Sequence, residues 1–400
     1  MKNQIKIRMI TILVSIILFA GCYWYVNNIM NQKPNVEEGA TTYAKARVLE
    51  LLSDDTQIDE DYEGALRGKQ EIIVQITEGI RKGESYQITN YLSALFNIDC
   101  QQGTKIVARI DEQSDGEIEV SVYSYNREIF LIGAIAIFMA LLCVIGGKKG
   151  IMSLLSLIYT LLNIFFVLIP ALYFGAPILP TTIGVIVVTN VVCFIMIDGV
   201  NKKTITAVLG TTTGVIAAGI FAYIIGKMAH VTGFHTNEAE ELLLVCRDYG
   251  LTITNLFTAG ILISALGAVM DVAMSISSAM NELHTLNPAL HAKDLFKSGM
   301  NIGRDAMGTM SNTLILAFVG SSLNLIIMIY SYDVPLTQLW ATDLVAREII
   351  QGISGSLGII LTVPFVAFFG SVIMKGTKQE IQFEEKTIKT VKKKQRRRGK

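Results

Sequence analysis

The chain has 400 residues, of which 51% are hydrophobic and only 17% are charged. Soluble globular proteins usually carry about 25% charged residues, so this composition argues against an ordinary soluble protein. The formal net charge is zero, yet residues 27–128 contain 19 acidic and 10 basic residues, whereas residues 375–400 contain 11 basic and 3 acidic ones. An acidic segment and a basic tail on one chain indicate two different compartments.

Eight segments are apolar over a length that can cross a bilayer, which takes about 20 residues of α-helix. Lysine and arginine gather in alternate connections between these segments, and such basic connections stay in the cytoplasm. We therefore predict an α-helical polytopic membrane protein with about eight transmembrane helices and with both termini in the cytoplasm. The predicted spans are Ile7–Val26, Ile129–Ile145, Ile151–Phe174, Ile178–Ile197, Ile205–Met228, Leu251–Met270, Thr309–Tyr330 and Ile353–Met374.

The first predicted span lies within residues 1–26 and is expected to be an uncleaved N-terminal signal anchor. The sequence FAGC at Phe19–Cys22 is similar to a lipoprotein cleavage site, but Phe19 stands where an aliphatic residue is expected. Tyr23, Trp24 and Tyr25 are typical of the membrane interface at the end of a retained helix. A retained anchor is therefore favoured over a cleaved signal.

Residues 27–128 are predicted to form a small extracytoplasmic β-rich domain, either a barrel or a sandwich. In EIEVSVYSY the apolar residues alternate, which is typical of a strand with one buried face. The domain has no nucleophile–base pair, so a binding or spacer role is favoured over catalysis. Cys100 and the later Cys246 can both face an oxidising exterior, which leaves a disulfide between them open. The predicted strands are Lys45–Leu51, Glu71–Thr77, Lys105–Asp111 and Ile118–Tyr125.

Residues 129–374 are predicted to form a seven-helix membrane domain. Ionisable residues in such a domain are the first candidates for function, because they are costly in a bilayer. Asp271 directly follows the sixth predicted span, at its cytoplasmic end. If the helix continues, Asp271, Ser275, Ser278 and Glu282 lie on one face. This stripe indicates either one wall of a water-filled path or an ordinary solvated surface.

The segment from Asp294 to Phe318 is the second candidate. Gly299 and Gly303 form a GxxxG pattern, which lets two membrane helices approach closely. Glycines also permit an unwound segment where protein or water satisfies the backbone. Arg304 has the opposite charge to the aspartate of the stripe, so we expect either an ion pair that fixes the packing or a site for a solute or ion.

Three other features favour packing or surface contact. The sequence GTTTG at Gly210–Gly214 predicts a helix–helix contact. The connection Ser331–Gln351 mixes apolar and charged residues and predicts an amphipathic helix on the membrane surface. The basic tail, residues 375–400, predicts contact with anionic lipid headgroups. Nucleic-acid binding is not expected, because aromatic residues do not interleave with the charges, and the histidine and cysteine spacing predicts no metal site.

Four sequence motifs allow a comparison with a known family. They are TYAKARVLEL, GGKKG, DVAMSISSAMNEL and SGMNIGRDAMGTMSNTLILAF, which lie between residues 42 and 318. With them the chain resembles the YibE/F-like family of bacterial multi-pass membrane proteins. The resemblance implies a bacterial plasma-membrane location and, as a partner, a related membrane protein or a second copy of the chain. It implies no catalytic residues and no cofactor.

Transport of a small solute or ion is the favoured function. The alternative is a membrane scaffold or sensor whose external β domain binds an envelope component or partner. An enzyme is not expected, because no GxSxG, HExxH or paired-aspartate signature occurs in the spans. The residues predicted to line a solute or ion pathway are Asp271, Ser275, Ser278, Asn301, Arg304, Asp305 and Asn312.

Overall fold

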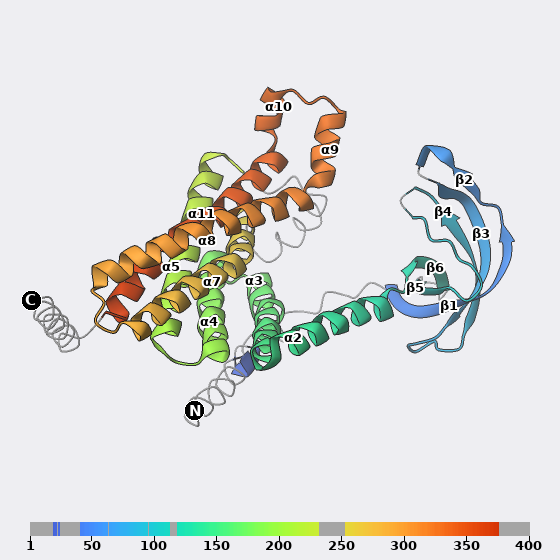
Figure 1. Cartoon of the computed structure of the whole chain (residues 1–400). Coiled ribbons are helices and arrows are strands. Elements are labelled where there is room, and N and C mark those ends of the chain that lie inside the picture. Colours follow the sequence, from blue (N-terminus) through green and yellow to red (C-terminus); the bar gives the residue numbers. More distant parts are fainter. Residues whose placement is uncertain are drawn as a thin grey trace, which may run out of the picture. The chain divides into compact units, whose positions relative to one another are not determined.

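The computed structural model of the chain describes residues 19–21, 23–24, 41–62, 64–94, 96–112, 118–231 and 253–375. The chain divides into two compact units (Figure 1). The β unit contains residues 33–145, and the helical unit contains residues 1–32 and 146–400. Most of the first predicted span, Cys246 and the basic tail beyond residue 375 lie outside the described residues.

The β unit is built on one six-stranded antiparallel sheet, and the strand order is β2-β3-β1-β5-β6 with β4 paired to β3. The long strand β1 has two irregularities, after Val48 and after Leu51, and such bulges bend a strand and increase its twist. The sheet therefore curls into a half-barrel. The strands are β1 (Thr41–Asp54), β2 (Gln57–Asp59), β3 (Ala65–Ile76), β4 (Ser85–Leu92), β5 (Lys105–Glu112) and β6 (Ile118–Tyr125), with a short 3-10 turn, η1 (Glu60–Tyr62), after β2.

Alternating side chains on β1, β3 and β5 form the core of the β unit. Val48, Ile72, Val74, Ile76 and Ile106 are fully buried, as expected for strands with one face on the core. All four predicted strands are present, and the sequence prediction missed β2 and β4. The sheet is neither a closed barrel nor a two-sheet sandwich, but a single curled sheet that forms a half-barrel.

One buried polar side chain, Gln70 on β3, connects the sheet to the loop after β4. Its amide nitrogen donates to the Asp99 carboxylate at 2.8 Å and to Asp54 at 3.2 Å. Its amide oxygen accepts from the backbone N–H of Cys100 at 3.0 Å and from Asn90 at 3.2 Å. Both the oxygen and the nitrogen of this buried amide are thus hydrogen-bonded, as burial of a polar group requires. Cys100 is a buried free thiol.

A long apolar stretch, Glu128–Tyr173, begins in the β unit and continues into the helical unit, and it contains three helical elements. They are α2 (Glu128–Asn163), a π-helical turn η2 (Ile164–Leu168) and α3 (Ile169–Tyr173). A straight helix of 46 residues would be about 69 Å long at 1.5 Å per residue. This is more than twice the ~30 Å hydrocarbon thickness. Gly147 interrupts α2 with φ 53° and ψ −135°. The second and third predicted spans lie on either side of this break.

Within the described residues, five helices are long and apolar enough to cross a membrane, and a bent pair makes a sixth candidate. This confirms a multi-pass protein but gives five to six candidate spans instead of about eight. The second and third predicted spans are one stretch, and the first is mostly undescribed. The remaining helices are α4 (Ile178–Asp198), α5 (Lys202–Met228), α7 (Ile253–Leu286), α8 (Ala292–Ser321), α9 (Leu323–Ser331), α10 (Leu336–Ala341) and α11 (Asp343–Ile373).

Helix α11 packs against α5, α7 and α8 and forms the centre of the helical unit (Figure 1). Close approach is possible because glycines meet side chains at these contacts. A Cβ on Gly210 of α5 would overlap Val366 of α11, and one on Gly214 would overlap the Thr362 hydroxyl. The helix-contact prediction for this GTTTG sequence is confirmed, and the contact has the small-residue character typical of membrane helices.

Helices α8 and α9 are bent by 60° at Ser322, so the predicted span Thr309–Tyr330 is present as a bent pair of helices that counts as the sixth candidate span. The predicted amphipathic surface helix within Ser331–Gln351 is replaced by the short helix α10 and by the first turns of α11. Because α11 continues without interruption to Ile373, the charged residues of this connection begin a long apolar helix.

Candidate functional site

The residues predicted on α7 lie on its outer face. Asp271 and Ser275 are exposed and Ser278 is half-buried, whereas the neighbouring Val272 and Ile276 are fully buried against the other helices. The helix continues without a break to Leu286. The predicted stripe therefore exists as one face of a helix that is longer than the predicted span.

The residues predicted on α8 also lie on its outer face. Asn301, Arg304, Asp305 and Asn312 are exposed, and Arg304 donates a long hydrogen bond of 3.4 Å to Asn301 within the same helix. The opposite face is buried at Leu295, Gly299 and Gly303. We call the seven predicted residues on the two helices the α7/α8 polar surface: Asp271, Ser275, Ser278, Asn301, Arg304, Asp305 and Asn312.

The GxxxG glycines of α8 fix how it meets α7. A Cβ on Gly299 would lie 2.7 Å from Sδ of Met280, and one on Gly303 would lie 3.0 Å from Cδ1 of Ile276. The two helices are thus antiparallel, and Ser275 lies level with Arg304. The regular helix at these glycines excludes the unwound alternative for this segment.

The expected ion pair between Asp271 and Arg304 is absent from the described part of the chain. The described ion pairs lie in the β unit and at the turn between α4 and α5, where Lys203 Nζ is 2.8 Å from Asp198. Asp271 is one helical turn beyond Ser275, the residue of α7 that is level with Arg304. The surface therefore holds Asp271 apart from Arg304 and its sequence neighbour Asp305.

The contacts of α7 and α8 with α11 show where Asp271 and Arg304 lie along the apolar segment of α11. A Cβ on Gly303 would overlap Val363, which is at the middle of the apolar segment Ile353–Met374. On α7, Val269 is level with Gly358 and Met280 with Gly370, so these two helices run in parallel. Both Arg304 and Asp271 consequently lie within about one turn of the middle of that segment. Helix α7 extends past Asp271 to Leu286, so this residue does not lie at the end of its helix.

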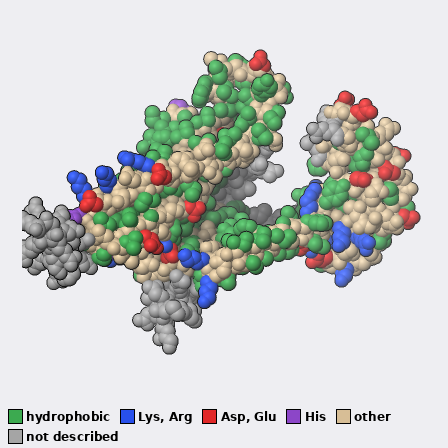
Figure 2. Space-filling model, viewed as in Figure 1, with side chains coloured by type: hydrophobic (Ala, Val, Ile, Leu, Met, Phe, Trp, Pro, Cys, Tyr) green, Lys and Arg blue, Asp and Glu red, His purple; other side chains and the backbone are tan. Residues whose placement is uncertain are grey.

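Figure 2 shows where charge gathers on the viewed face of the helical unit. Acidic and basic side chains lie mainly toward the end away from α9, whereas side chains near α9 are largely hydrophobic. Among the described residues, no group of three or more His, Cys, Asp or Glu side chains is placed to hold a metal ion. The chemistry that the α7/α8 polar surface offers is charge and hydrogen bonding.

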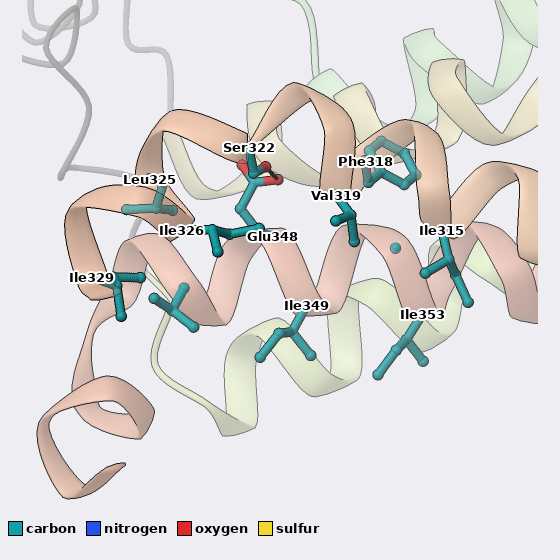
Figure 3. A pocket seen from close by; sticks show the side chains of 12 residues that line it. Ile315, Phe318, Val319, Ser322, Leu325, Ile326, Ile329, Glu348, Ile349 and Ile353 are labelled. Carbon is teal, nitrogen blue, oxygen red and sulfur yellow. Dashed lines mark hydrogen bonds between the residues drawn. The ribbon is translucent and has the colours of Figure 1, made fainter. Parts of the chain in front are cut away.

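The structure also contains a pocket that the sequence prediction missed. It lies between α8, α9 and α11 and has a volume of about 300 Å³. Eleven of its twelve lining residues carry no ionisable group, and the twelfth is Glu348. Ser322, at the bend between α8 and α9, donates a 2.5 Å hydrogen bond to this carboxylate (Figure 3). In the sequence, Glu348 is only a charged residue in a connection predicted to lie on the membrane surface. Because 26 residues separate it from Ser322, no local pattern joins the two.

The match to known proteins covers the helices that carry the polar surface and the pocket. The YibE/F-like protein family model matches residues 134–376, which is more than half of the chain. The chain belongs to the YibE/F-like family. The match begins within α2, so the six-stranded sheet with its TYAKARVLEL motif lies outside it. No curated protein and no solved structure matches this YibE/F-like chain.

Proposed function

We propose that this YibE/F-like protein is a permease-like membrane protein that moves a small polar solute or an ion along the α7/α8 polar surface. The observation that carries the proposal is the position of Asp271 and Arg304. Both are exposed on the outer face of the unit, yet both lie near the middle of the apolar segment of α11.

Charge at that depth is unfavourable when it faces lipid. Insertion scales give a cost of about 2.5–3.5 kcal/mol for Asp or Arg at the centre of a membrane helix. The two charges do not pair with each other in the described residues, so they need another polar environment. Water in a solute path would supply it, and a second copy of the chain or a related membrane protein would form the opposite wall.

The residues have distinct roles in this proposal. Asp271 binds a proton or a cation, because a carboxylate in a poorly solvated position gains from neutralisation. Arg304 attracts an anionic solute or compensates the negative charge of the surface. Ser275, Asn301 and Asn312 supply hydroxyl and amide groups that replace the hydration of a passing solute. No step of the proposal requires catalysis, a metal ion or a cofactor.

The proposal includes a topology in the bacterial plasma membrane. The break at Gly147 separates two spans, and an anchor within residues 1–26 brings the number of spans to about eight. Both termini are then cytoplasmic, the β unit is extracytoplasmic, and residues 375–400 contact anionic lipid headgroups. Lys148 and Lys149, directly after the break, support this orientation because basic connections stay in the cytoplasm.

Thiol accessibility tests the path without knowledge of the solute. In liposomes, Ser275→Cys is treated with a water-soluble methanethiosulfonate and compared with Ile360→Cys, an exposed position of α11 at a similar depth. The thiolate is the reactive species and forms in water, so we expect Ser275→Cys to react about 100-fold faster. Peptide mapping separates the product from the native cysteines. Equal slow rates would show that Ser275 faces lipid and would contradict a path.

Solute-dependent charge movement tests transport itself. Wild-type protein in liposomes on a solid-supported electrode is screened against ions and common metabolites, beside Asp271→Asn. Glu282→Gln is the matched control, because it removes an exposed carboxylate from the same stripe near the end of α7. We expect a current that Asp271→Asn abolishes and Glu282→Gln retains. If a current persists unchanged in Asp271→Asn, the proposed role of this residue is wrong.

A scaffold or sensor function is the second candidate, and one surface feature of the β unit favours it. Tyr43 on β1 and Tyr123 on β6 are both more than half exposed and pack edge to face, with ring centroids 4.9 Å apart. Exposed aromatic rings are common at binding surfaces. If replacing both tyrosines by serine removes an envelope partner from pull-downs while solute flux is retained, the β unit binds a partner independently of transport.

A further inference from the structure

The outer face of the curled sheet carries basic side chains close to the point where α2 begins. Residues 27–128 contain 19 acidic and 10 basic residues, so a basic area on this unit runs against its composition. Figure 2 shows basic side chains around the start of α2 and acidic side chains mainly on the parts of the sheet away from it. On the viewed face, positive charge is thus gathered beside the helix that leaves the β unit.

Arg47 of β1 and Lys105 of β5 lie directly opposite each other in the antiparallel pairing, and both are exposed. Side chains in such positions share one face, with Cβ atoms about 4.5–5.5 Å apart, and two like charges there destabilise the sheet. Neither strand is at an edge of the sheet, so the use of edge lysines against aggregation does not explain the pair. A negatively charged partner would remove the repulsion.

Arg127 adds a third positive charge to the same face. Its Nη1 donates to Ser124 Oγ at 2.6 Å. Ser124 pairs with Val107 of β5. Because Val107 is two residues from Lys105, the two side chains lie on the same face of the strand. We call Arg47, Lys105 and Arg127 the basic rim.

The basic rim has no acidic partner among the described residues, since none of their ion pairs includes it. By contrast, Lys45, two residues before Arg47, has two partners. Its Nζ lies 2.7 Å from Glu78 and 2.5 Å from Glu128. The nearby acidic side chains therefore neutralise the adjacent lysine and leave the rim unpaired.

The basic rim lies beside the first turn of a lipid-exposed helix. Asn126 and Arg127 alone separate β6 from α2, and the Asn126 N–H donates to the Lys105 carbonyl at 2.9 Å. The apolar residues Ile129–Ile132 are each more than half exposed. Four successive residues cover a complete helical turn, so this turn requires lipid on all sides. A bilayer that α2 enters at Glu128 has its headgroups level with the rim.

We propose that the basic rim docks the β unit on the bilayer surface by binding the phosphate groups of anionic lipids. The rim lies on the outer face of the half-barrel and comes from three chain segments. This arrangement fits an extended anionic surface, whereas a small solute is usually held in a concave site. The inference is independent of the transport proposal and applies to whichever leaflet the β unit faces.

Photocrosslinking of the wild-type full-length protein gives the first test. Phosphatidylcholine nanodiscs contain a trace of phosphatidylglycerol or phosphatidylcholine that carries the same diazirine close to its headgroup. Labelled peptides are mapped by mass spectrometry, and labelling of the rim is divided by labelling of residues 129–145, which excludes any contribution from the basic tail. Each basic residue near an anionic surface contributes about a fivefold preference. We therefore expect the anionic probe to label the rim at least about tenfold more, and equal labelling would overturn the proposal.

Lys105→Gln tests the rim against a matched control, Lys69→Gln, which removes the same charge from another exposed strand position. Lys69 lies on β3, seven residues or about 23 Å from Ile76, which pairs with Ala46. We expect Lys105→Gln and Arg47→Gln each to lower the preference for the anionic probe about fivefold, and Lys69→Gln to retain it. If Lys105→Gln retains the preference, or Lys69→Gln loses as much, the rim is not the binding surface.

Discussion

Replacement of Gly214 by alanine should destabilise the helical unit, although alanine is the better helix former. Gly214 lies on α5 where it crosses α11. An added Cβ would overlap the hydroxyl of Thr362 and would lie 3.1 Å from the Cβ of that residue and 3.2 Å from the Gly358 carbonyl oxygen. The threonine hydroxyl also donates to this carbonyl at 2.7 Å. Rotation of Thr362 could move its hydroxyl away, but it would break this hydrogen bond and would leave the tight contacts at 3.1 and 3.2 Å in place.

The magnitude follows from two opposing effects. Overpacking of a close contact costs about 1–3 kcal/mol, and the change from glycine to alanine inside a helix contributes up to about 1 kcal/mol in the other direction. The expected net loss is about 1–2 kcal/mol. Gly226→Ala is the matched control, because Gly226 is buried on the same helix but none of the described atoms lies within 4 Å of an added Cβ. That variant should be as stable as wild type or more stable.

The assay is reversible unfolding of the full-length protein in mixed micelles, followed by circular dichroism while the fraction of denaturing detergent increases. Gly214→Ala should unfold at a lower fraction than wild type, and Gly226→Ala should not. If Gly214→Ala is as stable as Gly226→Ala, the α5–α11 contact is looser than the structure describes, and the reasoning from close packing is refuted.

Four further predictions concern the β unit. Gln70→Leu removes the acceptor of the buried Cys100 N–H and should cost about 1–3 kcal/mol of stability, measured by pulse proteolysis of the full chain. Burial raises the pKa of the Cys100 thiol from 9.0 to about 12, so alkylation at pH 8 should be roughly a thousandfold slower than in urea. The stability that the protonated thiol contributes is present below pH 9.0 and is lost as the pH rises through about 12; Cys100→Ala should remove this alkaline loss in a denaturation series. Gly68→Ala should destabilise the sheet more than Gly64→Ala in thermal melts, because both have positive φ but only Gly68 has a backbone atom, the Asp55 carbonyl oxygen, where the Cβ would lie.

Local patterns in the sequence were sufficient for most of the β unit. The alternation in β3, β5 and β6 identifies strands because successive side chains point to opposite faces. The same rule missed β4, where Asn90 occupies a buried position of the alternation between Ile88 and Leu92. A polar residue is tolerated there because the Gln70 amide and the Ile98 carbonyl accept from it, and those partners lie on other segments.

Hydropathy could not give the depth of Asp271 or the bend at Ser322. A hydropathy window ends at the first charge, so it placed Asp271 outside a span. Its position beside the apolar segment of α11 depends on the parallel alignment of α7 with α11, which the contacts of Gly358 and Gly370 define. The Ser322–Glu348 hydrogen bond likewise joins segments that the sequence assigned to a span and to an external connection. Such information lies in packing between distant residues.

The interlocking of α5 and α11 limits how these two helices can move. Val366 sits over Gly210, and Thr362 sits over Gly214, one helical turn away. A displacement of α11 by less than a turn would bring Val366 onto Cβ-bearing residues between the two glycines, whereas a displacement of one full turn, about 5.4 Å, would bring it to the next glycine. The same displacement would move Thr362 from Gly214 onto Ala218, which carries a Cβ, so the two side chains together hold α11 in a single register along α5.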